Sequence, residues 1–206
     1  MCEWPTAAYR SLLPFLDPPQ YAAWQHREAR NGFEVVFLGP DASGRRLEGA
    51  TTAVEADTAW AIRYEIRLDG DWLTRSARVV GRSASAPRRE LTLESDGAGR
   101  WRIDGQPAPH LDGCLDVDLE SSALTNAFPV HRLGLQVAQE ASAPAAYVRA
   151  FGLSVERLEQ HYRRLENDGT RQRYGYAAPA LDFACELLYD EAGLLLDYPG
   201  LATRAA

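Results

Sequence analysis

The sequence of 206 residues contains no lysine, because all 22 of its basic residues are arginine. A lysine amine is needed by the phosphate-binding Walker loop, by Schiff-base catalysis and by the Ser-x-x-Lys nucleophile, so these chemistries are excluded. The 29 acidic residues outnumber the basic ones and leave a formal net charge of -7. Nucleic acid is therefore not an expected partner, since proteins that bind it carry a basic face.

Patterns that bind metals or form disulfides are also lacking. Cys2, Cys114 and Cys185 lie far apart in the chain, and no Cys-x-x-Cys, His-x-His or Gly-x-Ser-x-Gly motif occurs. We therefore expect no disulfide framework, no metal and no cofactor. No apolar run reaches the roughly 20 residues of a membrane helix, and the first residues do not resemble a signal peptide. We expect no membrane span and a cytoplasmic location.

Strict alternation of apolar and polar residues dominates the rest of the chain. It is clearest over residues 60–68, where one face is apolar and the other polar. Similar runs, separated by Gly and Asp about every ten residues, are typical of an antiparallel meander. They predict further strands at residues 21–28, 33–38, 46–55, 72–82, 90–94, 100–104, 114–120, 130–139, 146–151, 171–177, 181–188 and 194–198. The expected fold is a mainly β single domain over residues 1–206 with one extensive sheet.

Helical segments are few and short. Residues 1–20 are proline-rich and are expected to form an irregular leader, with room for one short helix over residues 6–15. A second short helix is expected over residues 122–128, with Ser122 as its N-cap. Residues 155–165 fit either a helix or a strand, and we favour a strand because Asn167-Asp168-Gly169 resembles a hairpin turn.

One hairpin places an arginine on an apolar face. Gly70-Asp71 is expected to form a two-residue type II′ turn, which pairs Leu68 with Leu73 and Ile66 with Arg75. Because a buried guanidinium is costly without a carboxylate, Arg75 has two interpretations. It forms an internal ion pair that fixes the sheet, or it faces a cavity and binds the polar head of a ligand.

Three carboxylates are candidates for the same site. Glu34 lies in an apolar strand, and Asp116 and Asp118 alternate with apolar residues, so both point to one face of their strand. Two carboxylates this close repel each other unless a cation, an arginine or a shared proton intervenes. Three explanations stay open: a solvated face, a network with Arg75 or Arg132, and a metal site or acid–base dyad.

The block CLDVDLESSALTNAFPVHRL over residues 114–133 resembles the DVDL…TP.TN.LPIRRL block of the "putative glycolipid-binding" family, formerly a domain of unknown function. The chain departs from that pattern at Ala123, which is usually proline, and at His131, which is usually arginine. The resemblance extends along nearly the whole chain, through Asn31-Gly32-Phe33-Glu34, Tyr64, Asp71 to Arg75, Gly99-Arg100-Trp101, Gln160-His161-Tyr162, Arg173-Tyr174, Asp190 to Leu194 and Asp197 to Leu201.

The resemblance implies a spiral β-roll, in which a long antiparallel curved sheet wraps around one helix. Such a fold is similar to the half-barrel lipid carriers of bacterial lipoprotein transport, and members of the family tend to be dimeric. The expected partners are therefore an amphipathic small molecule or glycolipid and a second copy of this chain in a homodimer.

The leading hypothesis is a non-enzymatic protein that binds an amphipathic ligand in the concave face of a curved sheet. Its apolar surface would come from Trp60, Tyr64, Trp72 and Trp101, each of which also fits an ordinary sheet core. Its polar groups would come from Glu34, Arg75, Asp116, Asp118, Asn126 and Arg132, although Asn126 also fits a turn.

Two hypotheses of other classes stay open. One is a hydrolase or isomerase that uses Asp116 or Glu34 as a general base, and the other is a dimeric scaffold without a pocket. The volume and lining of the largest cavity distinguish the three hypotheses.

Overall fold

The computed structural model of the chain describes residues 15–206. The helix expected over residues 6–15 and most of the expected leader lie outside the described residues. Residues 15–20 contain neither helix nor strand, as expected for the end of an irregular leader.

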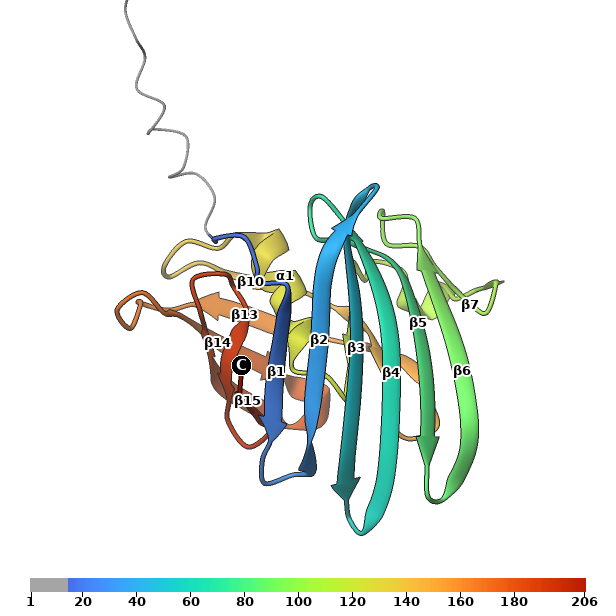
Figure 1. The fold of residues 1–206 in the computed structure, drawn as a ribbon. Coiled ribbons are helices and arrows are strands. Elements are labelled where there is room, and N and C mark those ends of the chain that lie inside the picture. Colours follow the sequence, from blue (N-terminus) through green and yellow to red (C-terminus); the bar gives the residue numbers. More distant parts are fainter. Residues whose placement is uncertain (1–14) are drawn as a thin grey trace, which may run out of the picture.

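A 14-stranded antiparallel sheet forms most of the molecule. Its spatial order is β10-β13-β14-β15-β16-β17-β1-β2-β3-β4-β5-β6-β7-β8, so the last strand of the chain pairs with the first, and the sheet is not closed. Figure 1 shows β1–β6 side by side as a curved layer, with the α-helix behind β1 and with β13–β15 at the left. The mainly β fold with a long curved sheet around one helix is therefore confirmed.

Most strands of this sheet follow the predicted runs closely, whereas β8, β10 and β17 were not predicted. The strands are β1 (Tyr21–His26), β2 (Asn31–Asp41), β3 (Gly44–Glu55), β4 (Thr58–Asp69), β5 (Thr74–Ser83), β6 (Ala86–Ser95), β7 (Trp101–Ile103), β8 (Gln106–Pro107), β10 (Glu140–Ser142), β13 (His161–Arg164), β14 (Gln172–Ala178), β15 (Phe183–Tyr189), β16 (Leu195–Tyr198) and β17 (Ala202–Arg204). Short 3-10 turns occur at η1 (Pro109–Leu111) and η3 (Pro179–Leu181).

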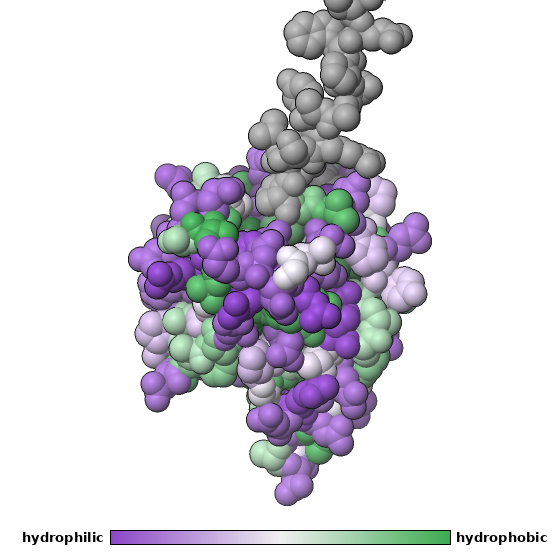
Figure 2. All heavy atoms as spheres, turned by 90° about the vertical axis from the view of Figure 1, so that its left-hand side faces the viewer, coloured by the Kyte–Doolittle hydropathy of each residue, from purple (hydrophilic) through white to green (hydrophobic). Residues whose placement is uncertain are grey.

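The side chains of β4 alternate between a buried inner face and an exposed outer face of the sheet. Trp60, Ile62 and Ile66 point inward and are at most 4% exposed, whereas Arg63 and Arg67 point outward and are exposed. Burying each large apolar side chain contributes roughly 1.5 to 3 kcal/mol, which favours the register that keeps this face inward. Figure 2 shows hydrophilic and hydrophobic residues interspersed on the outer side that carries β13–β15.

A small second sheet and the helix fill the inside. The three strands are β9 (Asp116–Leu119), β11 (Ala145–Val148) and β12 (Val155–Leu158), with β9 parallel to β11 and β11 antiparallel to β12. Every residue of β9 and β11 is buried, so both strands are covered on both faces. The 3-10 turn η2 (Leu124–Asn126) leads into α1 (Ala127–Leu133), which ends at Gly134 with φ 53°. No helix among residues 15–206 is long and apolar enough to cross a membrane.

Two predictions near the helix need correction. The strand expected over residues 130–139 is wrong, because α1 extends to Leu133 and residues 134–139 contain no strand. The short helix expected over residues 122–128 is present but begins later, with η2 at Leu124. Ser122 is not its N-cap, which is Ala123, although Ser122 Oγ accepts a hydrogen bond from the Leu124 backbone N–H at 3.1 Å. Residues 155–165 are strands, as favoured, but two of them (β12 and β13), which lie in different sheets.

The expected register of the β4–β5 hairpin is also wrong. Ile66 pairs with Ala77 rather than Arg75, and the register shifts between Arg67 and Leu68. The cause is Asp69, whose carboxylate accepts hydrogen bonds from the backbone N–H groups of Asp71 and Leu73 at 3.0 Å each. This holds a longer loop than the two-residue turn requires. Arg75 is consequently exposed on the outer side, 4.0 Å from the Asp69 carboxylate, and does not lie on the apolar face.

Candidate functional site

The inner face of the sheet carries one fully buried carboxylate, Glu34. Tyr64 reaches it because its partner across the strand pair is Gly49, where a Cβ atom would lie 2.1 Å from Tyr64 Cζ. The tyrosine ring thus passes over β3, and its hydroxyl donates to Glu34 Oε1 at 2.5 Å. Burial raises the pKa of both Glu34 and Tyr64.

Glu34 also fixes the segment that follows β9. Ser122 Oγ donates to Glu34 Oε1 at 2.5 Å, and the Ala123 backbone N–H donates to Oε2 at 2.7 Å. Both oxygens of this buried carboxyl group are thus bonded to the segment, which holds it firmly against the sheet. Glu34 therefore positions Ser122 and Ala123, both of which line the cavity described below.

Asp116 at the start of β9 forms an ion pair with Arg132 of α1. Arg132 Nε donates to one carboxylate oxygen at 3.1 Å and Nη2 donates to the other at 2.5 Å. The side chains are only 1% and 14% exposed. Of the three explanations for Asp116 and Asp118, the solvated face is wrong, and the network with Arg132 is confirmed for Asp116. No group of His, Cys, Asp and Glu residues within residues 15–206 could hold a metal ion.

Asp118 lies two residues further along β9 in a different environment. Thr125 Oγ1 and Gln160 Nε2 donate to its two oxygens at 2.6 Å each, and the structure shows no arginine paired with it among the described residues. Burial raises its pKa to about 6, and the two hydrogen bonds only partly oppose this shift. Asp118 is thus a carboxyl group that changes charge close to neutral pH.

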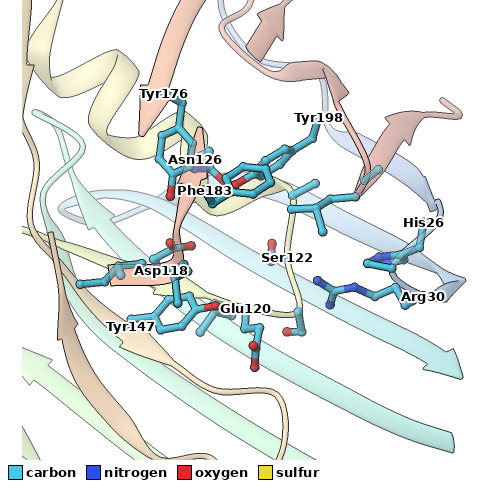
Figure 3. A pocket seen from close by; sticks show the side chains of 18 of the residues that line it. His26, Arg30, Asp118, Glu120, Ser122, Asn126, Tyr147, Tyr176, Phe183 and Tyr198 are labelled. Atoms are coloured by element: carbon cyan, nitrogen blue, oxygen red, sulfur yellow. The ribbon is translucent and has the colours of Figure 1, made fainter. Parts of the chain in front are cut away.

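A cavity of about 210 Å³ opens beside Asp118. It lies between the turn after β1, the segment after β9 and the strands β14–β17. Figure 3 shows the rings of Tyr176, Phe183 and Tyr198 together on one side, Tyr147 beside Asp118 and Glu120 on another, and His26 with Arg30 on a third. The aromatic residues are Tyr147, Tyr176, Phe183 and Tyr198, and the polar ones are His26, Arg30, Glu55, Asp118, Glu120, Ser121, Ser122 and Asn126.

Three of the rings form one contact group. Tyr176 lies 6.2 Å from Phe183 and 6.1 Å from Tyr198, and Phe183 lies 5.9 Å from Tyr198, measured between ring centroids. The tilted and edge-on geometries are those that aromatic pairs prefer. The Tyr176 hydroxyl accepts a hydrogen bond from Gln160 Nε2 at 3.0 Å, which ties this wall to Asp118.

Arg30 and His26 border the opposite side. Both are buried, at 8% and 5% exposed, and Arg30 Nε and Nη1 and both ring nitrogens of His26 have no hydrogen-bond partner among the described residues. Burial, and secondarily the charge of Arg30, lowers the pKa of His26 to about 4. His26 is therefore neutral at neutral pH.

The cavity contains only two of the residues that the sequence nominated, Asp118 and Asn126. Asn126 Nδ2 donates to the Tyr162 hydroxyl at 2.9 Å, so this residue also has a structural partner. Glu34 lies directly behind Ser122, and Tyr64 is bound to Glu34. Asp116 and Arg132 bind each other outside the lining.

The nominated tryptophans belong to the core. Trp72 stacks on His131 with 3.6 Å between ring centroids and 7° between planes. Trp101 Nε1 donates to the Cys114 carbonyl at 2.8 Å. Trp60 is 4% exposed and packs against Phe151. None of the three lines the cavity.

Most of the lining was missed by sequence reasoning. His26 had a signal, since the inward positions of β1 alternate from Ala22 through Trp24 to His26. Tyr176 had a similar one, as it alternates with exposed or half-buried neighbours in β14. Arg30 follows a turn, where no periodicity tells the direction of a side chain.

The comparisons with known proteins agree on a family. A family model with the description "Putative glycolipid-binding" matches residues 21–204. The crystal structure of a DUF1089 family protein from Pseudomonas aeruginosa is similar with a TM-score of 0.72 and 31% sequence identity, covering 99% of this chain and 98% of that one. A β-barrel-like protein with domain of unknown function DUF1849 from Brucella abortus has a TM-score of 0.48 and 8% identity, over 89% and 93% of the two chains. No curated protein matches this chain.

Proposed function

Because the chain belongs to the family described as "Putative glycolipid-binding", we propose that it binds an amphipathic ligand and that its cavity holds the sugar head group. The observation that carries this proposal is that three contacting aromatic rings, Tyr176, Phe183 and Tyr198, face a cavity whose other sides carry polar side chains (Figure 3). A sugar ring has the same division, with C–H groups on its faces and hydroxyl groups around its edge.

The polar wall offers both kinds of hydrogen-bonding group that hydroxyls need. Asp118 and Glu120 supply acceptor oxygens, and Arg30 supplies donors. Glu120 is itself held in place by the Ala150 backbone N–H at 2.6 Å and by Arg149 at 3.2 Å. Groups fixed in this way lose little conformational freedom when a ligand binds.

The size of the cavity restricts which part of the ligand it can hold. Its volume of about 210 Å³ is below the roughly 300 to 1,000 Å³ of sites that enclose a whole drug-sized ligand. An acyl chain must therefore leave through the opening. Leu181 and Leu201 belong to the lining, and Leu181 is 37% exposed, so they provide an apolar surface for the first carbons of the chain.

The proposal is tested by calorimetry with octyl β-D-glucoside below its critical micelle concentration. We expect the wild-type protein to bind it, and Phe183→Ala to bind it roughly 3- to 10-fold more weakly, since an aromatic contact contributes about 0.5 to 1.5 kcal/mol beyond its buried area. Phe37→Ala is the matched control, because Phe37 is 64% exposed and is not part of the cavity lining. Absence of binding to both this glucoside and the corresponding octyl β-D-glucuronide, or equal loss in both variants, would overturn the proposal.

A second candidate function, acid–base catalysis, is favoured by the pKa of about 6 at Asp118 within a cavity. The bases expected from the sequence are poorly placed for it, since Asp116 is bound to Arg132 and Glu34 accepts three hydrogen bonds behind the lining. This function requires that the protein hydrolyse 4-nitrophenyl β-D-glucoside and that Asp118→Asn abolish the turnover. Binding without turnover would leave the non-enzymatic function.

A further inference from the structure

The turn that carries Arg30 is held rigidly at one end of the cavity. The Arg27 backbone N–H donates to the Leu201 carbonyl at 2.9 Å, and the Ala29 N–H donates to the Gly200 carbonyl at 3.3 Å. These bonds tie the β1–β2 turn to the segment between β16 and β17. Figure 3 shows the Arg30 guanidinium extending into the cavity from this turn, with His26 beside it.

Arg30 differs from the other buried or half-buried arginines around the site. Arg132 and Arg149 have carboxylate partners, whereas no described carboxylate lies within ion-pair distance of Arg30. The Trp60 ring centroid lies 5.6 Å from the guanidinium carbon, and the charge of Arg30 also acts on the buried Glu34 carboxyl group without forming an ion pair with it. A buried guanidinium with unpaired N–H groups is costly, and an anionic oxygen is the group that satisfies it best.

We propose that the ligand carries an anionic group, such as a carboxylate or a phosphate ester on the sugar, which binds to Arg30 and His26. This inference rests on the function proposed above and assigns a chemical class to its ligand. The planar guanidinium can donate two parallel hydrogen bonds to one anionic group. The neutral His26 ring can donate one more and accept one from a neighbouring hydroxyl.

The acidic residues of the cavity do not prevent an anionic group from binding beside Arg30. Glu120 is neutralised by Arg149 at 3.2 Å, and both oxygens of Asp118 already accept hydrogen bonds from Thr125 and Gln160. Glu55 lines the cavity as well but is half-buried. The anion therefore binds on the Arg30 side, and the hydroxyl groups of the sugar face Asp118 and Glu120.

The test compares two amphiphiles that differ in one group. Octyl β-D-glucuronide has a carboxylate where octyl β-D-glucoside has a hydroxymethyl group. We expect the wild-type protein to bind the glucuronide at least 10-fold more tightly in calorimetry at pH 7. Arg30→Met should weaken glucuronide binding roughly 10- to 100-fold, the range for hydrogen bonds to charged groups, and change glucoside binding less than about 3-fold.

Three further arms keep the result unambiguous. Arg63→Met removes an exposed arginine on the outer face of β4 and should bind both amphiphiles as the wild type does. Arg30→Lys keeps the positive charge but lacks the planar guanidinium, so it should retain part of the preference for the glucuronide over the glucoside. This variant keeps the test informative if Arg30→Met fails to fold. Inorganic phosphate should compete only weakly with the glucuronide for the wild-type protein. If phosphate binds as tightly as the glucuronide does, the site binds a free anion and the proposal is overturned.

The failures of the two proposals are distinguishable. If the wild type binds neither amphiphile, the sugar-head-group function itself is wrong. If it binds both equally and Arg30→Met changes neither affinity, the function stands and the anionic class of the ligand is wrong.

Discussion

Breaking the ion pair between Asp116 and Arg132 should destabilise the protein more than any exposed pair does. The two side chains join β9 to α1 through two hydrogen bonds at 3.1 and 2.5 Å. Replacing Arg132 by Met leaves a carboxylate that is 1% exposed without a countercharge. Removing one partner of such a buried pair costs about 3 to 5 kcal/mol of the free energy of unfolding.

The expected loss can be followed by thermal unfolding. For a chain of 150 to 250 residues, 1 kcal/mol corresponds to about 2 to 4 °C in Tm, so Arg132→Met should lower Tm by roughly 6 to 20 °C. Restoring neutrality with an apolar residue, in the double variant Asp116→Val with Arg132→Met, should recover most of this loss, because two apolar groups need no countercharge.

Arg173 and Glu186 form a matched control with the same two-bond geometry on the outer face. Their hydrogen bonds are 2.6 and 2.7 Å long, but the side chains are 35% and 45% exposed. An exposed pair is worth about 0.2 to 1 kcal/mol, so Arg173→Met should lower Tm by less than about 4 °C. Equal losses for Arg132→Met and Arg173→Met, or a double variant no better than the single one, would refute the argument that burial sets the cost.

Three further predictions concern titration and packing, all checked by urea unfolding. The pKa of Asp118 is raised to about 6, so its contribution to the free energy of unfolding is full below about pH 4 and is lost as pH rises through 6. The stability of the wild type relative to Asp118→Asn should therefore fall by roughly 2 to 3 kcal/mol between pH 4 and 7, and a flat difference would contradict this. Burial lowers the pKa of His131 to about 3, so the unfolded chain binds a proton at a higher pH than the folded protein does. Between pH 6.5 and 4, the free energy of unfolding of His131→Phe should therefore fall by about 3 kcal/mol less than that of the wild type. Gly49→Ala should cost about 1 to 3 kcal/mol because its Cβ would meet the Tyr64 ring, whereas Gly39→Ala, with nothing within 4 Å, should not.

Strand period was a sufficient guide to the large sheet. In β4 the inward residues are apolar at every second position, and a shift by one residue would expose all of them, so tertiary packing reinforces the local pattern. The small inner sheet is a different case. A solvated face of β9 was one interpretation of Asp116 and Asp118, yet both are buried, with Arg132 of the nearby helix bound to Asp116 and Gln160 bound to Asp118.

The turn after β4 shows how a small local error changes a functional assignment. Gly70-Asp71 fits a two-residue turn, but the Asp69 carboxylate accepts hydrogen bonds from two backbone N–H groups and stabilises a longer loop. Arg67 pairs with Ser76 and Leu68 with Thr74, so Arg75 is left without a partner in β4 at this irregularity of the ladder. Arg75, expected on the apolar face, ends on the outer side near the Gly97 turn.

The sequence predicted the environment of one functionally relevant arginine, Arg132, and missed that of another, Arg30. It offered Arg132, as well as Arg75, as a partner for Asp116 and Asp118, and Arg132 of α1 does bind Asp116 of β9. It missed Arg30, whose burial depends on residues 200 and 201 closing over its turn more than 170 positions later. An arginine inside a protein normally has a carboxylate near it, and a chain that buries one without a described partner spends stability at that position. Such a cost is typical of binding sites, where the missing partner belongs to the ligand. Arg30, rather than Arg75, is therefore the arginine on which the ligand of this protein should be sought.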